Sequence, residues 1–299
     1  MTSHDDPEVV DNRAQADLND VKLSFVGCGV MAESIIAGLL RKGLVVPDQI
    51  TGSHPRPGRR EELKSRYDIQ VVESNRAAAE ITTATVEYDK PLKSIVLLTV
   101  KPQRLNVVLG ELKGVLKEDQ LLLSIVAGAR LETIAKEVGH AAIVRAMPNT
   151  PAQIGQGMTT WIATPQVSEQ MQMKIRALLG ALGEEMSVET ENMIDMATAL
   201  SATGPTYVFM VMEALVDAGV HMGFSRHVAQ ELVLQTMFGS IIFARESAKH
   251  PAELRNMVTS PGGTSAEAIY QMEKGSLRTV LSKAVWAAFQ RAVALGRKG

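Results

Sequence analysis

A glycine-rich turn near the N-terminus is the sequence feature that most constrains the fold of this chain. Residues 27–32 read Gly-Cys-Gly-Val-Met-Ala, a match to the pattern G-x-G-x-x-A. Leu23, Phe25 and Val26 precede this turn as a short apolar strand, and apolar residues at helical spacing follow it over 35–40. In a dinucleotide site the first glycine permits the turn, the second admits the pyrophosphate, and the small third residue lets the helix pack on the sheet. The pattern therefore predicts a nucleotide-binding strand–helix unit, and a purely structural glycine turn is the alternative.

Further apolar runs predict a sheet built from parallel strands. We expect these strands over residues 49–53, 71–72, 95–100, 121–125 and 141–147. Helical patterns alternate with them, which is typical of an α/β doubly wound parallel sheet. A further strand over 161–163 and a helix over 171–182 follow. Because ligands of such sheets lie outside the carboxyl ends of the strands, residues 99–102 should border a nucleotide, and the small residues at 126–129 would admit a nicotinamide ring.

The segment after the second expected strand indicates which dinucleotide is bound. An NAD site usually carries an acidic residue there, which grips the ribose hydroxyls. Residues 53–60 instead read Ser-His-Pro-Arg-Pro-Gly-Arg-Arg and contain no carboxylate. Guanidinium groups such as that of Arg56 attract a 2′-phosphate. This composition favours NADPH, with NADH possible as well, and a solvated basic turn is the alternative, above all for Arg59 and Arg60.

The second half of the chain has a different pattern. From about Glu191 the strand signals disappear, and we expect helices over residues 193–202, 207–222, 227–248, 251–258, 265–272 and 276–295. Several of these helices have more than one apolar face, which is typical of helices that pack on another chain. We therefore predict an all-α dimerisation domain and a homodimer, and a monomeric bundle is the alternative.

The length and charge of the chain limit its organisation and its partners. With 299 residues we expect a disordered tail over 1–20, a nucleotide-binding domain over 21–187 and a helical domain over 188–299. The tail is polar and acid-rich, unlike a secretory signal or transit peptide, which predicts a cytoplasmic protein. The formal net charge of −2 makes nucleic acid an unexpected partner. The longest apolar run, 196–212, is broken by glycine and proline, so we expect a buried or dimer-forming helix and no membrane span.

A second informative stretch covers residues 260–267, Ser-Pro-Gly-Gly-Thr-Ser-Ala-Glu. Thr264 and Glu267 match a capping box, with Thr264 as the N-cap of a helix. The glycines leave backbone N–H groups uncovered beside the helix N-terminus, a site for an anion such as a substrate carboxylate. The alternative is a capped helix without a ligand. The small polar residues of 201–207 could form the opposite wall of the pocket.

The absence of other catalytic motifs limits the kinds of reaction that the chain can catalyse. Cys28 is the only cysteine, which excludes an intramolecular disulfide and a cysteine-based metal site, and we interpret it as a small residue that fills a gap. No metal-binding or nucleophile motif is present, so we expect no metal. Apart from His54 on the cofactor side, no histidine lies in the candidate pocket segments. A dehydrogenase that acts on an alcohol or ketone normally needs a positioned acid or base such as Lys or His. A reductase that acts on an imine needs less, because a ring nitrogen is basic enough to carry its own proton.

The sequence resembles the pyrroline-5-carboxylate reductase family. The matching segments are residues 27–33, 100–103, 147–151, 204–209 and 258–267, and the resemblance extends from about residue 21 to 295. It implies an oxidoreductase that reduces L-1-pyrroline-5-carboxylate to L-proline with NAD(P)H, the last step of proline biosynthesis. It also implies a Rossmann domain followed by a helical domain that interlocks with a second subunit, in dimers that sometimes assemble into a decamer.

The resemblance also assigns the site residues. It places the substrate at Gly262, Gly263, Thr264 and Ser265, and we expect catalysis to depend on Thr264 and Ser265. Position 265 is usually a threonine that hydrogen-bonds the ring nitrogen, and the serine keeps that hydroxyl. Residues 202–204 read Ala-Thr-Gly where the family commonly has Gly-Ser-Gly. Together with Arg56, the expected cofactor-binding residues are Val26, Gly27, Cys28, Gly29, Val30, Met31, Ser53, His54, Asn75, Thr99, Val100, Lys101, Pro102, Ile125, Val126 and Ala127.

Two other functions stay open at this point. A β-hydroxyacid dehydrogenase would share the architecture, but it is expected to carry a lysine on the helix after the Rossmann domain, and residues 193–212 contain none. A non-catalytic NADP-binding sensor would use the helical half for signalling.

Overall fold

The computed structural model of the chain describes residues 18–81 and 94–296. The chain divides into two compact units. The first unit comprises Met1–Ala202 and Arg291–Gly299, and the second comprises Thr203–Gln290. The predicted tail over 1–20 falls mainly on residues 1–17, which lie outside the described residues, and the division of the chain at residues 187 and 188 stays a prediction.

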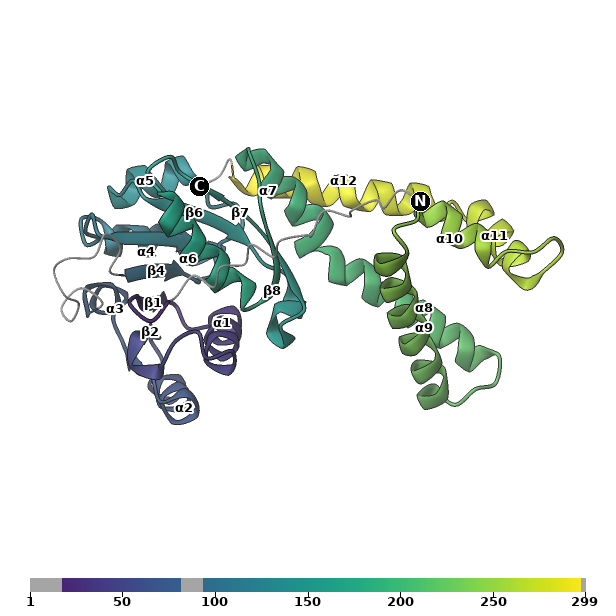
Figure 1. The fold of residues 1–299 in the computed structure, drawn as a ribbon, viewed down its shortest axis with the longest axis horizontal. Coiled ribbons are helices and arrows are strands. Elements are labelled where there is room, and N and C mark those ends of the chain that lie inside the picture. Colours follow the sequence, from purple (N-terminus) through teal and green to yellow (C-terminus); the bar gives the residue numbers. More distant parts are fainter. Residues whose placement is uncertain (1–17, 82–93, 297–299) are drawn as a thin grey trace, which may run out of the picture. The chain divides into compact units, whose positions relative to one another are not determined.

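The first unit is built on an eight-stranded sheet with the order β3-β2-β1-β4-β5-β6-β7-β8 (Figure 1). Its strands are β1 (Lys22–Val26), β2 (Ile50–Ser53), β3 (Gln70–Val72), β4 (Ser94–Leu98), β5 (Gln120–Ser124), β6 (Ile143–Met147), β7 (Gly157–Ala163) and β8 (Gly183–Ser187). The first six strands pair in parallel, in the order of a dinucleotide-binding fold. The predicted doubly wound sheet is therefore confirmed. Strand β7 runs antiparallel to β6, and β8, which the sequence did not predict, pairs in parallel with β7.

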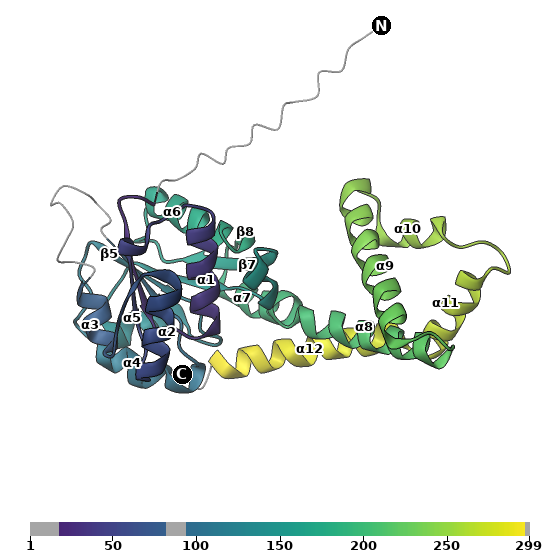
Figure 2. The same cartoon turned by 90° about the horizontal axis from the view of Figure 1, so that it is seen from below.

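Helices lie on both sides of this sheet (Figure 2). They are α1 (Val30–Arg41), α2 (Pro57–Tyr67), α3 (Asn75–Ile81), α4 (Leu105–Leu112), α5 (Leu131–Val138), α6 (Glu169–Gly180) and α7 (Glu191–Ala197), with short 3-10 turns η1 (Pro47–Gln49), η2 (Pro102–Arg104) and η3 (Thr150–Ile154). Successive strand residues point to opposite faces. In β4, Ile95 and Leu97 pack in one core with α1 and α6, and Val96 and Leu98 pack in another with α4 and α5. The nearly continuous apolar run of this strand is thus explained by burial on both faces.

The helical part of the chain follows α7. A π-helical turn over Thr198–Ala202 ends the first stretch of the first unit. The second unit contains α8 (Gly204–His221), α9 (Arg226–Ser247), α10 (Pro251–Met257), α11 (Thr264–Lys274) and most of α12 (Leu277–Gly296), whose end belongs to the first unit. These helices agree with those predicted from the sequence to within a few residues at each end.

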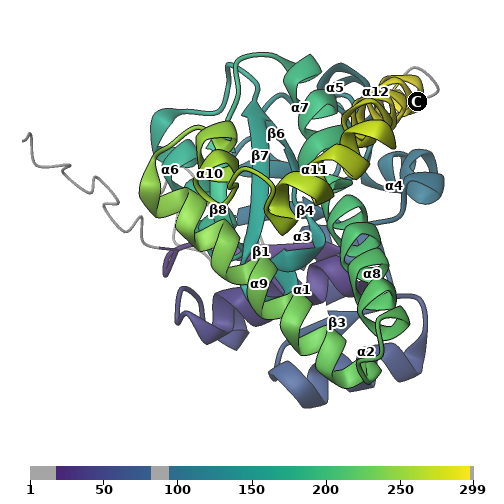
Figure 3. The same cartoon turned by 90° about the vertical axis from the view of Figure 1, so that its right-hand side faces the viewer.

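The second unit buries very little of its own apolar surface. Of residues 203–290, all of which the structure describes, only Val216, Gly219 and Ala229 are buried. Helices α8 and α9 contact each other near the turn that joins them (Figure 3), with Gly219 against Ala229. Large side chains stay exposed, among them Phe209 (58%) and Trp286 (60%). Extensive exposed apolar surface of this kind marks an interface.

One helical stretch among the described residues, Glu191–His221, is long and apolar enough to cross a membrane by length and composition. Part of it is α8, whose exposed side chains belong to the apolar surface described above.

Candidate active site

The expected cofactor residues come together at the carboxyl ends of four neighbouring strands. Backbone hydrogen bonds join the ends of β1, β2, β4 and β5 and the residues that follow them. The N–H of Cys28 donates to the carbonyl of Ser53 (2.8 Å), and the N–H of Thr99 donates to that of Val26 (3.0 Å). The N–H of Ile125 donates to the end of β4 (3.1 Å). This edge of the sheet is where a doubly wound fold binds its ligand.

Gly27 makes the turn after β1. Its φ of +93° is unfavourable for residues with a Cβ, and a Cβ there would lie 2.5 Å from Cγ1 of Val100. The hydroxyl of Thr99 donates to the carbonyl of Gly27 (2.9 Å) and also lies 3.1 Å from the carbonyl oxygen of Val26. The turn is therefore fixed by residues that follow β4.

Gly29 faces open space at the start of α1. A Cβ on Gly29 would have no atom of the described residues within 4 Å, and no side chain caps this 12-residue helix. Val30 is exposed, whereas Ala32 is fully buried against the sheet. The free N–H groups and the positive end of the helix dipole suit an anion. The space in front of Gly29 and the uncapped helix therefore fit the pyrophosphate of a dinucleotide.

A buried serine supports the turn from β2. Ser53 is fully buried, and its hydroxyl accepts from the N–H of Gly27 (3.0 Å) and donates to Oδ1 of Asn75 (2.6 Å). The amide of Asn75 donates in turn to Glu111 (2.7 Å). The side chains of Val26 and Val126 are buried as well, so only the backbone of these two residues can face a ligand.

Cys28 is a packing residue. Its side chain is fully buried, and burial raises the pKa of its thiol to about 12. A Cβ on Gly52 would lie 2.4 Å from Sγ of Cys28, so the glycine in β2 makes room for the thiol. A protonated, enclosed thiol is inert, which supports the interpretation of Cys28 as a residue that fills a gap.

The three arginines after β2 differ in their contacts. Arg59 forms ion pairs with Glu33 of α1 and with Glu62 (2.9 Å). Arg60 donates to the carbonyls of residues 54 (3.0 Å) and 55 (2.9 Å). The guanidinium of Arg56 is exposed and has no hydrogen-bond or ion-pair partner within the described parts of the chain. Arg56 is thus available to a phosphate, and Arg59 and Arg60 are occupied within the chain.

His54 lies beside Arg56. Its Nδ1 accepts from the N–H of Arg56 (3.2 Å), which leaves Nε2 as the donor. Burial, and then the positive charge of Arg56, lower the pKa of His54 below its ordinary value of 6.5. The imidazole is therefore neutral at neutral pH and can donate one hydrogen bond to a phosphate or hydroxyl oxygen.

A cluster around Glu33 joins α1 to α2. Its carboxylate accepts from Arg59, Arg66 (2.7 Å) and the hydroxyl of Tyr67 (2.9 Å). Burial raises the pKa of Glu33, but the hydrogen bonds from Arg59 and Tyr67 outweigh it, so the net pKa is lowered. The sequence did not predict this cluster, since its members are separated by a strand.

The loop after β5 is a tight turn. The N–H of Ala129 donates to the carbonyl of Val126 (3.2 Å), and Gly128 has a φ of +75°. Ala127 occupies the tip. On the neighbouring strand end, Lys101 is exposed and Pro102 begins η2.

The expected substrate residues belong to the second unit. Gly262 has a φ of +69°, and the N–H of Gly263 donates to the carbonyl of Ser260 (3.0 Å). The predicted capping box is wrong: Gly263 is the N-cap of α11, Thr264 is its first residue, and no side chain caps the helix. The backbone of Gly263 is extended, and its carbonyl accepts the first helical hydrogen bonds, from the N–H groups of Ala266 (3.1 Å) and Glu267 (3.3 Å). The start of α11 is therefore uncapped.

The segment over 147–151 meets the π-helical turn inside the first unit. Asn149 accepts from the N–H of Met158 (2.9 Å), and its amide lies 3.4 Å from the carbonyl of Ser201. Ala202 ends the first stretch of the first unit, and Thr203 begins the second unit, so the role of residues 201–207 as a pocket wall stays a prediction.

Comparisons with known proteins agree over most of the chain. A family model described as pyrroline-5-carboxylate reductase dimerisation matches residues 191–295, and one described as NADP oxidoreductase, coenzyme F420-dependent, matches residues 22–128. The chain is 38% identical to a pyrroline-5-carboxylate reductase of Synechocystis sp., over 93% of this chain and 99% of that protein. It is 34% identical to the reductase of Escherichia coli, over 92% and 98% of the two chains.

Two solved structures are similar as well. A pyrroline-5-carboxylate reductase from Coxiella burnetii has a TM-score of 0.81 and 34% identity, over 93% of this chain and 99% of that chain. A Plasmodium falciparum pyrroline carboxylate reductase with NADP bound has a TM-score of 0.81 and 29% identity, with the same coverage.

Proposed function

The chain belongs to the pyrroline-5-carboxylate reductase family, and we propose that it reduces L-1-pyrroline-5-carboxylate to L-proline with NAD(P)H, the last step of proline biosynthesis. The observation that carries the proposal is the open space at Gly29 before an uncapped helix, at the strand ends of a doubly wound sheet. That geometry suits a dinucleotide. Because the chain matches the relatives over nearly their whole length, the proposal includes the substrate-binding part of the reductase as well.

The proposed cofactor site uses three parts of the first unit. The start of α1 beside Gly29 would hold the pyrophosphate. Arg56 and the Nε2–H of His54 would hold the 2′-phosphate, which favours NADPH over NADH. The segments 99–102 and 125–127 would line the nicotinamide, which supplies a hydride when bound.

The proposed substrate site lies at the start of α11. The uncapped N–H groups after Gly262 and Gly263 would bind the carboxylate, and the hydroxyl of Ser265 would orient the ring nitrogen, with Thr264 beside it. Residues 260–266 contain no titratable side chain, so the imine brings its own proton. A hydride added to the carbon of the protonated C=N bond moves the electron pair onto nitrogen and gives the amine. The residues therefore act by binding and orientation.

We further propose a homodimer formed through the helical domain. The dimerisation model over residues 191–295 and the exposed side chains of α8 and α9 support it. Association of dimers into a decamer, a cytoplasmic location, and the absence of membrane and nucleic-acid partners are part of the same proposal. The mass of the purified protein in solution distinguishes a monomer, a dimer and a decamer.

The activity is tested by following the absorbance of NADPH after addition of pyrroline-5-carboxylate. We expect NADPH oxidation that depends on the imine, with proline as the product, and slower oxidation of NADH. Tight NADPH binding without turnover on any cyclic imine would instead support the NADP-binding sensor. Turnover only on a β-hydroxyacid with NADP would support the dehydrogenase.

A further inference from the structure

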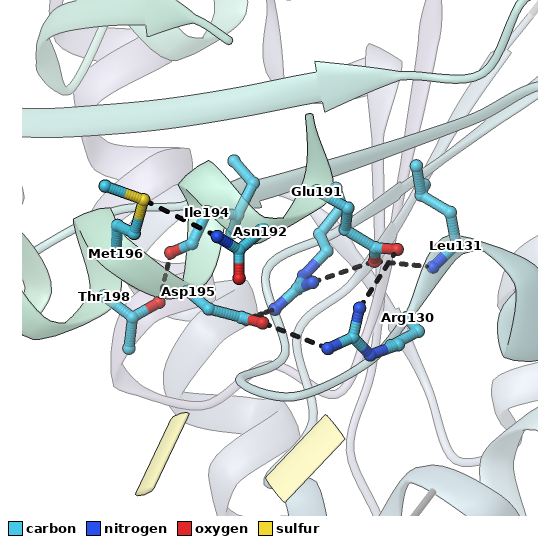
Figure 4. Close-up of polar contacts among 9 residues, drawn as sticks. Arg130, Leu131, Glu191, Asn192, Ile194, Asp195, Met196 and Thr198 are labelled. Carbon is cyan, nitrogen blue, oxygen red and sulfur yellow. Dashed lines mark hydrogen bonds and ion pairs between the residues drawn. The ribbon is translucent and has the colours of Figure 1, made fainter. Parts of the chain in front are cut away.

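Four charged residues connect the loop after β5 to α7 in the first unit (Figure 4). Arg145 of β6 donates to Glu191 (2.8 Å) and to Asp195 (2.7 Å), both of α7. Arg130, which follows the loop as the N-cap of α5, donates to the other oxygen of Asp195 (3.2 Å). Glu191 also lies 3.8 Å from Arg130 and accepts from the N–H of Leu131 (2.9 Å). We call Arg130, Arg145, Glu191 and Asp195 the four-residue network.

The centre of the network is buried and its charges balance. The side chains of Arg145 and Asp195 are each 1% exposed, and two guanidinium groups face two carboxylates. Removal of Arg145 would break its pairs with Glu191 and Asp195 and leave the buried carboxylate of Asp195 with Arg130 alone, which is destabilising. Arg130 is the most accessible member, with 31% of its side chain exposed, so its charge can be removed at a lower cost in stability.

The loop after β5 also packs against the end of α12. A Cβ on Gly128 would lie 2.9 Å from Cβ of Leu295, and a Cβ on Gly296 would lie 2.9 Å from Nε of Arg130. Arg130 therefore contacts both Asp195 and Gly296. The tip of the turn, Ala127, lies three residues before this fixed point.

We propose that Arg130 is a positioning residue for the nicotinamide half of the cofactor. By tying the end of the loop to α7, it fixes the backbone of residues 125–127, which in turn line the nicotinamide. The inference rests on the proposed function, because the lining role of that loop belongs to it. A purely structural ion pair would affect both halves of the cofactor site alike, and this difference makes the inference testable.

The test compares two ligands on the intact protein. NADPH carries the nicotinamide, whereas adenosine 2′,5′-bisphosphate carries only the adenosine half. For Arg130→Gln we expect the Kd of NADPH by calorimetry to rise roughly 3- to 30-fold, the range typical of residues that act on a site through others. The Kd of adenosine 2′,5′-bisphosphate should stay unchanged. As a matched control, Arg176→Gln removes an arginine that pairs with Glu185 (3.1 Å) in the same unit, and it should change neither constant.

Two further variants separate the effect of the position of the Arg130 side chain from the effect of its charge. Gly296→Ala adds a methyl group against Arg130 without removing a charge, and it should weaken NADPH binding selectively in the same way. Arg130→Lys keeps the charge and should recover part of the lost affinity. If Arg130→Gln unfolds in thermal melts, these two variants carry the test.

Equal weakening of both ligands, or of neither, would overturn the inference. A wild-type protein that does not bind NADPH would instead contradict the proposed function, so the two failures are distinguishable.

Discussion

Cγ1 of Val100 lies 2.5 Å from the position that a Cβ would take on Gly27. The strand end of β4 thus occupies the space that any other residue in the glycine turn would need. For Gly27→Ala we expect a loss of stability of at least about 1–2 kcal/mol, because an alanine is strained at a positive φ and must also displace Val100. NADPH binding should be lost as the turn moves. Denaturant unfolding and a cofactor titration measure the two effects, and full NADPH affinity in this variant would contradict the description of the turn.

Gly29→Val should behave differently, although Gly29 is only two residues away. The new side chain meets no atom within 4 Å among the described residues, so the free energy of unfolding should stay within about 0.5 kcal/mol of wild type. The valine would fill the space proposed for the pyrophosphate, and we expect no measurable binding of NADPH. Gly110→Val, another open helical position, is the matched control and should bind NADPH normally. Retained binding in Gly29→Val would place the pyrophosphate elsewhere.

Arg56→Ala should act on cofactor choice. Loss of one charge-assisted contact to the 2′-phosphate costs about 1.5–3 kcal/mol, so the KM for NADPH should rise on the order of 10- to 100-fold. The KM for NADH should not change. The control is Arg59→Ala, which removes the ion pair with Glu33 and should lower stability more than it alters the ratio of the two KM values. An equal effect of Arg56→Ala on both cofactors would contradict the assignment.

Ser265→Ala should reduce turnover. Loss of one positioned hydroxyl donor lowers kcat on the order of 10²-fold. The affinity for NADPH should be unaffected, because all the proposed cofactor residues lie in the first unit. Ser265→Thr keeps the hydroxyl and serves as the control, with most of the activity expected. A parallel loss of NADPH affinity in the alanine variant would count against a substrate role for Ser265.

Glu33→Gln should make stability depend less on pH. The pKa of Glu33 is lowered in the folded protein from its ordinary value of 4.5, so its stabilising effect is fully present above pH 4.5 and is lost as the pH falls through the folded pKa. At pH 7 the variant should be about 1 kcal/mol less stable, and the difference from wild type should vanish in acid. Urea unfolding of both proteins at a series of pH values from 7 down into acid measures this difference in the free energy of unfolding. Glu80→Gln, which breaks an exposed pair with Arg76, should show a smaller change.

The sequence predicted those features that depend on the conformation of a short segment of backbone or on the spacing of its apolar residues. The glycine turn, the buried strands and the helices of the second half all follow from spacing within short windows. Strand β8 was missed because its residues, Gly-Glu-Glu-Met-Ser, lack an apolar run, and the direction of β7 depends on its partner β6. The capping role of Thr264 was wrong because the helix begins one residue earlier, with the carbonyl of Gly263 accepting from the N–H of Ala266 (3.1 Å).

Contacts between distant segments could not be predicted from the sequence alone. The four-residue network joins Arg130, Arg145, Glu191 and Asp195, which lie on three separate elements. One signal was available: an arginine inside an otherwise apolar strand needs a partner when it is buried. The sequence did not show that Arg59 pairs with Glu33 and that Arg60 donates to backbone carbonyls. These contacts leave Arg56 as the arginine of this segment that is available to a phosphate.

The return of the chain to the first unit at Arg291 has a consequence for its synthesis. The turn at Gly128 packs on Leu295, a residue that leaves the ribosome only after the whole second unit has been translated. The nucleotide-binding half therefore cannot complete its packing while it emerges, although most of it is translated first. Its last contacts must form after the intervening helices have been translated.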